Sequence, residues 1–249
     1  AEVCPGATTT LSDAGGGSWT SGSPSVATIG SSSGVVTGVL SSGGTSVITY
    51  TLPVTGCTAN VTVTVDPAPA PISGTFSICQ ETSTVLTDAG GGSWSSSFVT
   101  IGSIDPSGLV MGLAPGTTTI TYTLPGTGCT TSSVLTVNPL PTVTAISGTL
   151  TLCAGTNSTL TDATSGGVWS SSNPAIVTVG TSGVATGTGV GIANISYSVT
   201  NGSGCTNYAT ATVTVNGAPV AIGGPDHLCA GGTISLTESG FGTWFSGTP

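Results

Sequence analysis

The sequence predicts an all-β protein, built as a tandem array of antiparallel β-sandwiches, and three observations lead to that prediction. Tryptophan occurs only at positions 19, 94, 169 and 244, so the step is 75 residues each time. Short runs alternate β-branched apolar residues with polar ones and are separated by Gly, Ser and Pro, as strands and turns of a sandwich are. The 3.6-residue periodicity of amphipathic helices is absent from the sequence.

Each tryptophan ends a glycine-rich turn that begins with an acidic residue. The four copies are Asp13-Ala-Gly-Gly-Gly-Ser-Trp19, Asp88-Ala-Gly-Gly-Gly-Ser-Trp94, Asp162-Ala-Thr-Ser-Gly-Gly-Val-Trp169 and Glu238-Ser-Gly-Phe-Gly-Thr-Trp244. The repeat divides the chain into units 1–68, 69–141 and 142–218 and a partial unit 219–249. In the first unit we expect strands at 8–12, around Trp19, and at 26–29, 34–40, 45–52 and 60–65.

Proline-containing linkers join the units and are expected to be semi-rigid, because proline fixes φ and favours extended backbone. The linkers are Asp66-Pro-Ala-Pro-Ala-Pro71, Asn138-Pro-Leu-Pro141 and Asn216-Gly-Ala-Pro219, of which the third should bend most easily. After each linker an opening strand is predicted at Ile72-Ser-Gly, Ile146-Ser-Gly or Ile222-Gly-Gly. The first unit lacks this strand and the fourth stops soon after its Trp, so we expect further units in the natural chain. Completion of the fourth unit by strand donation from another subunit fails, because the missing strands do not match in number.

The charge composition excludes several functions. Lys and Arg are absent, nine residues are acidic and the net charge is −9. Nucleic-acid binding therefore loses its main electrostatic contribution, and separate arrays should repel one another weakly. Apolar runs stay far below the roughly 18 residues of a membrane span. Ser and Thr, a third of the chain, supply the polar surface and leave room for O-linked glycans.

Seven cysteines indicate an oxidising, extracellular or cell-surface location, and their spacing does not fit a zinc site. Two pairings fit their order. Pairing within units gives Cys4–Cys57, Cys79–Cys129 and Cys153–Cys205, with the partner of Cys229 outside the sequence; pairing across linkers gives Cys57–Cys79, Cys129–Cys153 and Cys205–Cys229. We favour pairing within units, because the last strand of a unit carries the chain about 26 Å away from its cysteine. Each bond would then contribute roughly 4 kcal/mol to its unit.

Candidate site residues have structural explanations that we prefer to functional ones. The acidic residues Asp13, Asp88, Asp162 and Glu238 are expected to cap turns rather than to bind calcium, which needs more carboxylates in one place. Trp19, Trp94, Trp169 and Trp244 are expected in the core, the alternative being sugar stacking. The pattern at 30–34 resembles a GxSxG nucleophile elbow but lacks the helix and the histidine, since His227 occurs once and far away. We expect no catalytic, metal or cofactor site.

The arrangement resembles the group 2 bacterial Ig-like domain, as in tandem copies in large secreted proteins of Bacteroidota. The residues that carry the resemblance are Trp169-Ser-Ser-Ser-Asn-Pro-Ala-Ile-Val-Thr-Val-Gly180, Ser182-Gly-Val-Ala-Thr-Gly187 and Ala193-Asn-Ile-Ser-Tyr197, with matching segments in the first unit. It differs from antibody-type domains, where a tyrosine lies two residues before the second cysteine; Tyr50 and Tyr122 lie seven residues before theirs. The resemblance implies the fold across nearly the whole chain and is weak for function.

Three functions remain. The first is a structural component of an extracellular bacterial fibre, filament or stalk that assembles with itself or with neighbouring repeats. The second is an adhesin or glycan-binding array that uses the Trp residues and turns. The third is a non-catalytic spacer of a larger secreted protein. The first is favoured, because the units are nearly identical, stiff linkers join them, and no catalytic group recurs among them.

Overall fold

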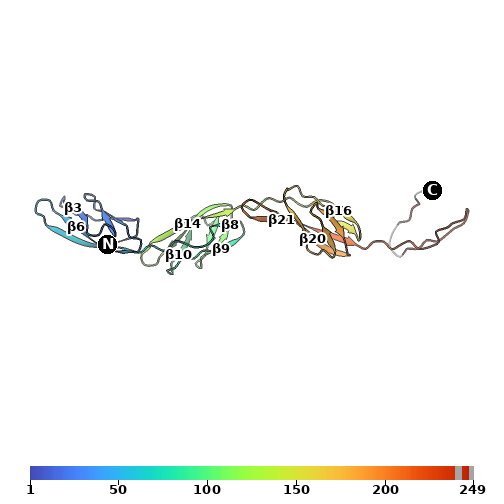
Figure 1. Ribbon diagram of the computed structural model, residues 1–249, viewed down its shortest axis with the longest axis horizontal. Coiled ribbons are helices and arrows are strands. Elements are labelled where there is room, and N and C mark those ends of the chain that lie inside the picture. The colour runs from blue at the N-terminus through green and yellow to red at the C-terminus, as the bar shows by residue number, and fades with distance from the viewer. Residues whose placement is uncertain (239–242, 247–249) are drawn as a thin grey trace. The chain divides into compact units, whose positions relative to one another are not determined.

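The computed structural model describes residues 1–238 and 243–246, and their regular secondary structure is all β-strand (Figure 1). The chain divides into two compact units that are larger than the sequence repeats, Ala1–Pro139 and Leu140–Pro249, and these are called the first and the second unit below. The first unit holds two β-sandwiches, and the second holds one, followed by the segment 217–249. The all-β prediction is confirmed.

The first sandwich packs a four-stranded sheet, ordered β1-β7-β6-β3, on a three-stranded sheet, ordered β2-β5-β4. Its strands are β1 (Glu2–Val3), β2 (Thr8–Thr10), β3 (Ser18–Ser21), β4 (Ala27–Ile29), β5 (Val35–Gly38), β6 (Gly44–Thr51) and β7 (Thr58–Val65). Alternate residues of β6 and β7 point inward because side chains in a strand alternate between faces. Ile48 and Val63 thus meet Val36 of the other sheet, and all three are fully buried.

The second sandwich repeats this topology, with sheets ordered β10-β13-β14-β8 and β11-β12-β9. Its strands are β8 (Ser77–Cys79), β9 (Ser83–Val85), β10 (Ser93–Ser96), β11 (Gly102–Ile104), β12 (Leu109–Gly112), β13 (Gly116–Thr123) and β14 (Thr130–Asn138). Leu86, Ile120 and Leu135 are fully buried at its centre.

The third sandwich, in the second unit, has sheets ordered β15-β21-β20-β17 and β16-β19-β18. Its strands are β15 (Thr151–Cys153), β16 (Asn157–Thr159), β17 (Val168–Ser171), β18 (Val177–Val179), β19 (Val184–Gly187), β20 (Gly191–Thr200) and β21 (Thr206–Asn216). Its core again combines both sheets, with Val177, Ile195 and Val213 fully buried.

The first strand of each sandwich runs parallel to the last, which the sequence did not reveal. The pairs are β1 with β7, β8 with β14, and β15 with β21. The predicted opening strands are wrong in extent: each Ile-(Ser/Gly)-Gly segment makes a single bridge, at Ser73↔Thr87, Ser147↔Thr161 and Gly223↔Thr237. Gly74, at φ +137°, ends the extended run there, and a Cβ on it would lie 2.7 Å from Leu86 Cδ2.

The segment after the third sandwich forms no sheet among its described residues, and Gly223↔Thr237 is its bridge. Part of the fourth predicted turn, residues 239–242, lies outside the described residues. Trp244, predicted in a core, is 56% exposed, since no described sheet covers its ring.

Candidate functional site

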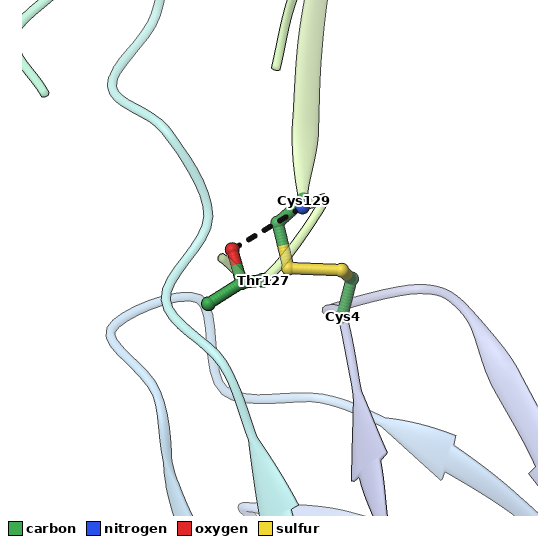
Figure 2. Close-up of a disulfide and its surroundings, with 3 residues drawn as sticks. All are labelled: Cys4, Thr127 and Cys129. Atoms are coloured by element: carbon green, nitrogen blue, oxygen red, sulfur yellow. Dashed lines mark hydrogen bonds between the residues drawn. A yellow bond between two sulfur atoms is a disulfide. The ribbon is translucent and has the colours of Figure 1, made fainter. Parts of the chain in front are cut away.

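One disulfide joins the two sandwiches of the first unit. It connects Cys4 to Cys129 with a Cα–Cα distance of 5.5 Å (Figure 2). We call a cysteine at or directly after the end of a first strand an opening cysteine (Cys4, Cys79, Cys153), and use the same name for Cys229, which has the equivalent sequence position in the fourth repeat. A cysteine that directly precedes a last strand is called a late cysteine (Cys57, Cys129, Cys205). The bond therefore joins the opening cysteine of one repeat to the late cysteine of the next.

Neither pairing that we derived from the sequence is correct. Cys129 is bonded to Cys4, which excludes Cys4–Cys57, Cys79–Cys129 and Cys129–Cys153. Cys57, Cys153 and Cys229 carry free, exposed thiols within the described part of the chain, which excludes Cys153–Cys205, Cys57–Cys79 and Cys205–Cys229. Cys79 and Cys205 are also half-cystines.

The parallel first strand explains the error. Because Val3 pairs with Val65, Cys4 lies at the end of β7 where the chain leaves the sandwich, whereas Cys57 lies just before β7 begins. Eight residues of strand separate these ends by about 26 Å, far beyond the 7 Å or so that a disulfide allows. On the sequence alone, the length of the last strand is an argument against disulfides across the linker. In the structure, the same length rules out a disulfide within one sandwich.

The linker between these two sandwiches is held by backbone hydrogen bonds. The Asp66 N–H donates to the Val3 carbonyl (3.0 Å), and the Ala68 N–H donates to the Ser41 carbonyl (2.9 Å). Pro69 and Ile72 are buried. On the side of the second sandwich, the Cys129 N–H donates to Thr127 Oγ1 within its own loop (3.3 Å, Figure 2). Cys129 is only 1% exposed. The junction is therefore packed, hydrogen-bonded and covalently closed.

The tryptophans of the three sandwiches each contact a tyrosine directly opposite on the neighbouring strand. The pairs are Trp19–Tyr50, Trp94–Tyr122 and Trp169–Tyr197, each with ring centroids 4.6 Å apart. Such cross-strand aromatic pairs are stabilising. All three Trp rings are half-buried against their cores. The sequence analysis named these tyrosines but missed their contact with the tryptophans, although Trp19, Trp94 and Trp169 are each followed about 30 residues later by Ile-Thr-Tyr or Ile-Ser-Tyr.

The same tyrosines explain the glycines of the recurring turn. Each phenol oxygen accepts a hydrogen bond from the backbone N–H of the glycine two residues before the Trp: Gly17, Gly92 and Gly167. A Cβ on Gly92 would lie 2.2 Å from the Thr123 carbonyl oxygen, and one on Gly167 would lie 2.3 Å from Tyr197 Cζ. Glycine is required there because the backbone passes directly under the ring and the adjacent strand.

Two of the acidic residues before the tryptophans cap their turns as predicted, and one does not. Asp13 accepts from the Gly15 N–H (2.9 Å), and Asp162 accepts from the Thr164 N–H (2.8 Å) and the Thr144 hydroxyl (2.6 Å). Burial would raise the pKa of Asp162, but these hydrogen bonds outweigh it and the pKa is lowered. Both carboxylate oxygens of Asp88 are buried without a hydrogen bond, and burial raises its pKa.

The surface hollows beside the tryptophans are small. One of about 250 Å³ is lined by Trp19, Tyr50, Asp13 and Asn60 among others, and one of about 220 Å³ by Trp94, Tyr122 and Asp88 among others. Both are below the roughly 300–1,000 Å³ of ordinary small-molecule sites. In the described ranges, no three His, Cys, Asp or Glu side chains gather as metal ligands. A helix able to cross a membrane is likewise not found in these ranges.

The segment that matched the GxSxG pattern is a hairpin turn and not a nucleophile elbow. It links β4 to β5, and the Gly34 N–H donates to the Gly30 carbonyl (3.0 Å). His227 lies 3.4 Å from Asp226, and both side chains are almost fully exposed.

The fold and its junction define a tandem array of Ig-like β-sandwiches. No family model and no curated protein matches the chain. Among solved structures it is similar to domains 1-6 of the surface layer protein SbsC, with 15% identity, 88% of this chain and 39% of that chain covered, and a TM-score of 0.29. It is also similar to a C-terminal fragment of intimin in complex with the intimin-binding domain of its translocated receptor (14% identity, 60% and 64% covered, TM-score 0.32).

A third similar structure is mouse protocadherin-24 EC1-3, with 14% identity, 88% of this chain and 96% of that chain covered, and a TM-score of 0.24. The chain spans less than half the length of two of the SbsC fragments that it matches, at 39% and 44%. The similarity is too low for any of these functions to be transferred to this chain.

Proposed function

We propose that this chain is a structural component of an extracellular bacterial fibre, filament or stalk. The observation that supports this role is the Cys4–Cys129 disulfide, which joins successive sandwiches across their linker instead of reinforcing one sandwich. A bond in that position does not improve a binding pocket or a catalytic centre. It resists separation and bending of neighbouring repeats, as a tether under tension requires.

Immunoelectron microscopy tests the role directly. An antibody raised against the chain should label fibres or stalks outside the producing cells, along their length, in unreduced samples. Labelling that is diffuse, or confined to the cell interior, would contradict the proposal.

An adhesive or glycan-binding array is the second candidate, because Trp19, Trp94 and Trp169 are only half-buried and keep part of their rings open to a ligand, although the hollows beside Trp19 and Trp94 are small. Acrylamide quenching of Trp fluorescence discriminates between the two roles. It should be done in a Trp244→Phe background, because the exposed Trp244 would otherwise dominate the signal. Weak quenching of the three remaining tryptophans supports the structural role, and strong quenching that a glycan suppresses supports the adhesive one.

A spacer within a larger secreted protein is the third candidate. The full reading frame tests this candidate. A catalytic domain encoded in the same frame would mean that the sandwiches serve as the spacer of that enzyme.

A further inference from the structure

The three free cysteines include one late cysteine, Cys57, whose surroundings match those of the bonded Cys129. The Cys57 N–H donates to Thr55 Oγ1 at 3.3 Å, as the Cys129 N–H does to Thr127 Oγ1 at 3.3 Å. The Cys57 carbonyl accepts from Leu52 at 3.0 Å, and that of Cys129 accepts from Leu124 at 2.9 Å. The two backbones are therefore in the same conformation, yet Cys129 is buried at the junction and Cys57 is exposed.

The opening cysteine Cys153 matches the bonded Cys4 in the same way. The carbonyls of Cys4 and Cys153 each accept a hydrogen bond at 3.0 Å from the N–H three residues later. The turns that follow are anchored alike, with Gly6 donating to the Gly38 carbonyl and Gly155 to the Gly187 carbonyl, both at 2.8 Å. Cys153 pairs in register with Asn216, at the end of the last strand of its sandwich, and its thiol is exposed.

We propose that Cys57 and Cys153 form junction disulfides of the Cys4–Cys129 type with further repeats of the same kind. Cys57, a late cysteine, bonds to the opening cysteine of a repeat that precedes it. Cys153, an opening cysteine, bonds to the late cysteine of a repeat that follows it. Cys57 is a late cysteine and Cys153 is an opening cysteine, which are the two types that the Cys4–Cys129 bond joins. Every junction would therefore have the same polarity along the array. This inference deepens the proposed structural role and rests on it for its biological meaning, whereas the bonds themselves follow from the local geometry.

The partner repeat has two sources with the same chemistry. It belongs either to the same polypeptide or to a second copy of this chain. In both cases two thiols lose two protons and two electrons to a disulfide-containing oxidant, such as oxidised glutathione, which is released as two reduced thiols. The product is one sulfur–sulfur bond per junction.

Disulfide mapping of the natural protein tests the proposal. The protein is isolated without reductant in the presence of an alkylating reagent and digested with chymotrypsin or pepsin, because trypsin finds no Lys or Arg to cut. We expect no alkyl label on Cys57 or Cys153. Mass spectrometry should detect the Cys57 peptide linked to a peptide with an opening cysteine, and the Cys153 peptide linked to a peptide with a late cysteine. The Cys4–Cys129 peptide in the same digest is the control that disulfides survived.

The inference would be overturned if Cys57 or Cys153 were found alkylated or capped by glutathione. A bond between two late cysteines, or between two opening cysteines, would also overturn it. The mass before and after reduction separates the two sources. A fall in mass on reduction assigns the partner to a second copy, and an unchanged mass, larger than 23.7 kDa, assigns it to the same polypeptide. Failure of the mapping is distinguishable from failure of the proposed function, because the immunoelectron microscopy does not depend on these bonds.

Discussion

Asp88 and Asp162 occupy equivalent places in successive repeats, yet their pKa values shift in opposite directions. Both threonines that bond to the Asp162 carboxylate, Thr144 and Thr164, are replaced in the preceding repeat, by Ala70 and Gly90. Thr144 donates its hydroxyl to Asp162 at 2.6 Å, whereas Ala70 has no side-chain donor. Ala70 and Asp88 line the same hollow, of about 360 Å³, so there is space for the missing hydroxyl. The Asp88 carboxylate thus lacks a hydrogen bond that a hydroxyl-bearing side chain at position 70 would supply.

The substitution Ala70→Thr should raise the stability of the second sandwich by about 1 kcal/mol at pH 7, because a hydroxyl would then bond to the Asp88 carboxylate. In the parent, the raised pKa of Asp88 favours the folded state only at low pH, and that contribution is lost as pH rises through the folded pKa. The variant lowers that pKa, so its advantage should disappear as pH falls below about 3. Urea denaturation across this pH range measures both effects.

Ala70→Val is the matched control, since valine has the shape of threonine without the hydroxyl. A valine variant as stable as the threonine variant at pH 7 would show that filled space, and not the hydrogen bond, is responsible.

Glu81 is the one non-glycine residue with a left-handed backbone in the described chain, at φ +66°. The equivalent positions in the other repeats are Gly6, Gly155 and Gly231, with φ between +77° and +86°. Glu81→Gly should therefore stabilise the second sandwich, and Gly155→Ala should destabilise the third by about 1 kcal/mol, because only glycine adopts this conformation freely. Space is not a factor at Gly155, where a Cβ would meet nothing within 4 Å. Thermal unfolding checks both, and a Glu81→Ala variant as stable as Glu81→Gly would contradict the backbone explanation.

At the scale of single elements, the tyrosine opposite each tryptophan fixes the glycine-rich turn. Tyr122 accepts one hydrogen bond, from the Gly92 N–H (2.6 Å). Tyr197 accepts one from the Gly167 N–H (2.8 Å) and also donates to the Thr164 carbonyl (2.7 Å). The third sandwich thus has a more firmly held turn than the second.

Tyr122→Phe should cost the second sandwich about 1 kcal/mol, and Tyr197→Phe should cost the third about twice as much, since it removes two hydrogen bonds. Hydrogen exchange followed by mass spectrometry resolves the peptides of each sandwich and measures the two losses separately. Equal losses would mean that the phenol-to-Thr164 bond contributes nothing.

The long strands of the sandwiches could be predicted from the sequence because they show alternation. β6 and β7 lie within a few residues of their predicted bounds, 45–52 and 60–65. The strands β1, β8 and β15 could not, because two or three residues carry no periodicity and their partner is the last strand, over 50 residues away. The Trp–Tyr contact was missed for a similar reason, since register between distant strands is set by tertiary packing.

At the scale of the whole molecule, the cysteine pairing was the main failure of the sequence analysis. Spacing suggested two solutions, and the Cys4–Cys129 bond belongs to a third that spans 125 positions. Selecting it requires knowing that the first strand is parallel to the last, which places Cys4 at the exit of its sandwich. An unpredicted two-residue strand therefore decided the connectivity.

The position of the bond changes the expected effect of reduction. In the isolated chain, Cys4→Ser/Cys129→Ser should leave both cores of the first unit folded but allow the two sandwiches to open independently. The chain-entropy model gives an upper limit of about 5 kcal/mol for the lost stabilisation of the unit. Differential scanning calorimetry should show the transition of this unit broaden or split.

Cys57→Ser/Cys153→Ser is the matched control, because neither thiol is bonded within the chain. An equal effect from this pair would assign the change to the substitutions themselves and not to the junction.

The disulfide also determines how the first unit responds to a pull on its two ends. Force entering at Ala1 leaves the backbone at Cys4, crosses the sulfur–sulfur bond and rejoins the backbone at Cys129, so residues 5–128 carry no load. The loaded path contains about fifteen residues and extends to about 50 Å, whereas the reduced unit of 139 residues could be drawn out to about 470 Å. Single-molecule pulling should record this tenfold difference in extension when reductant is added. Even with both sandwiches unravelled, the oxidised unit remains a short, inextensible link.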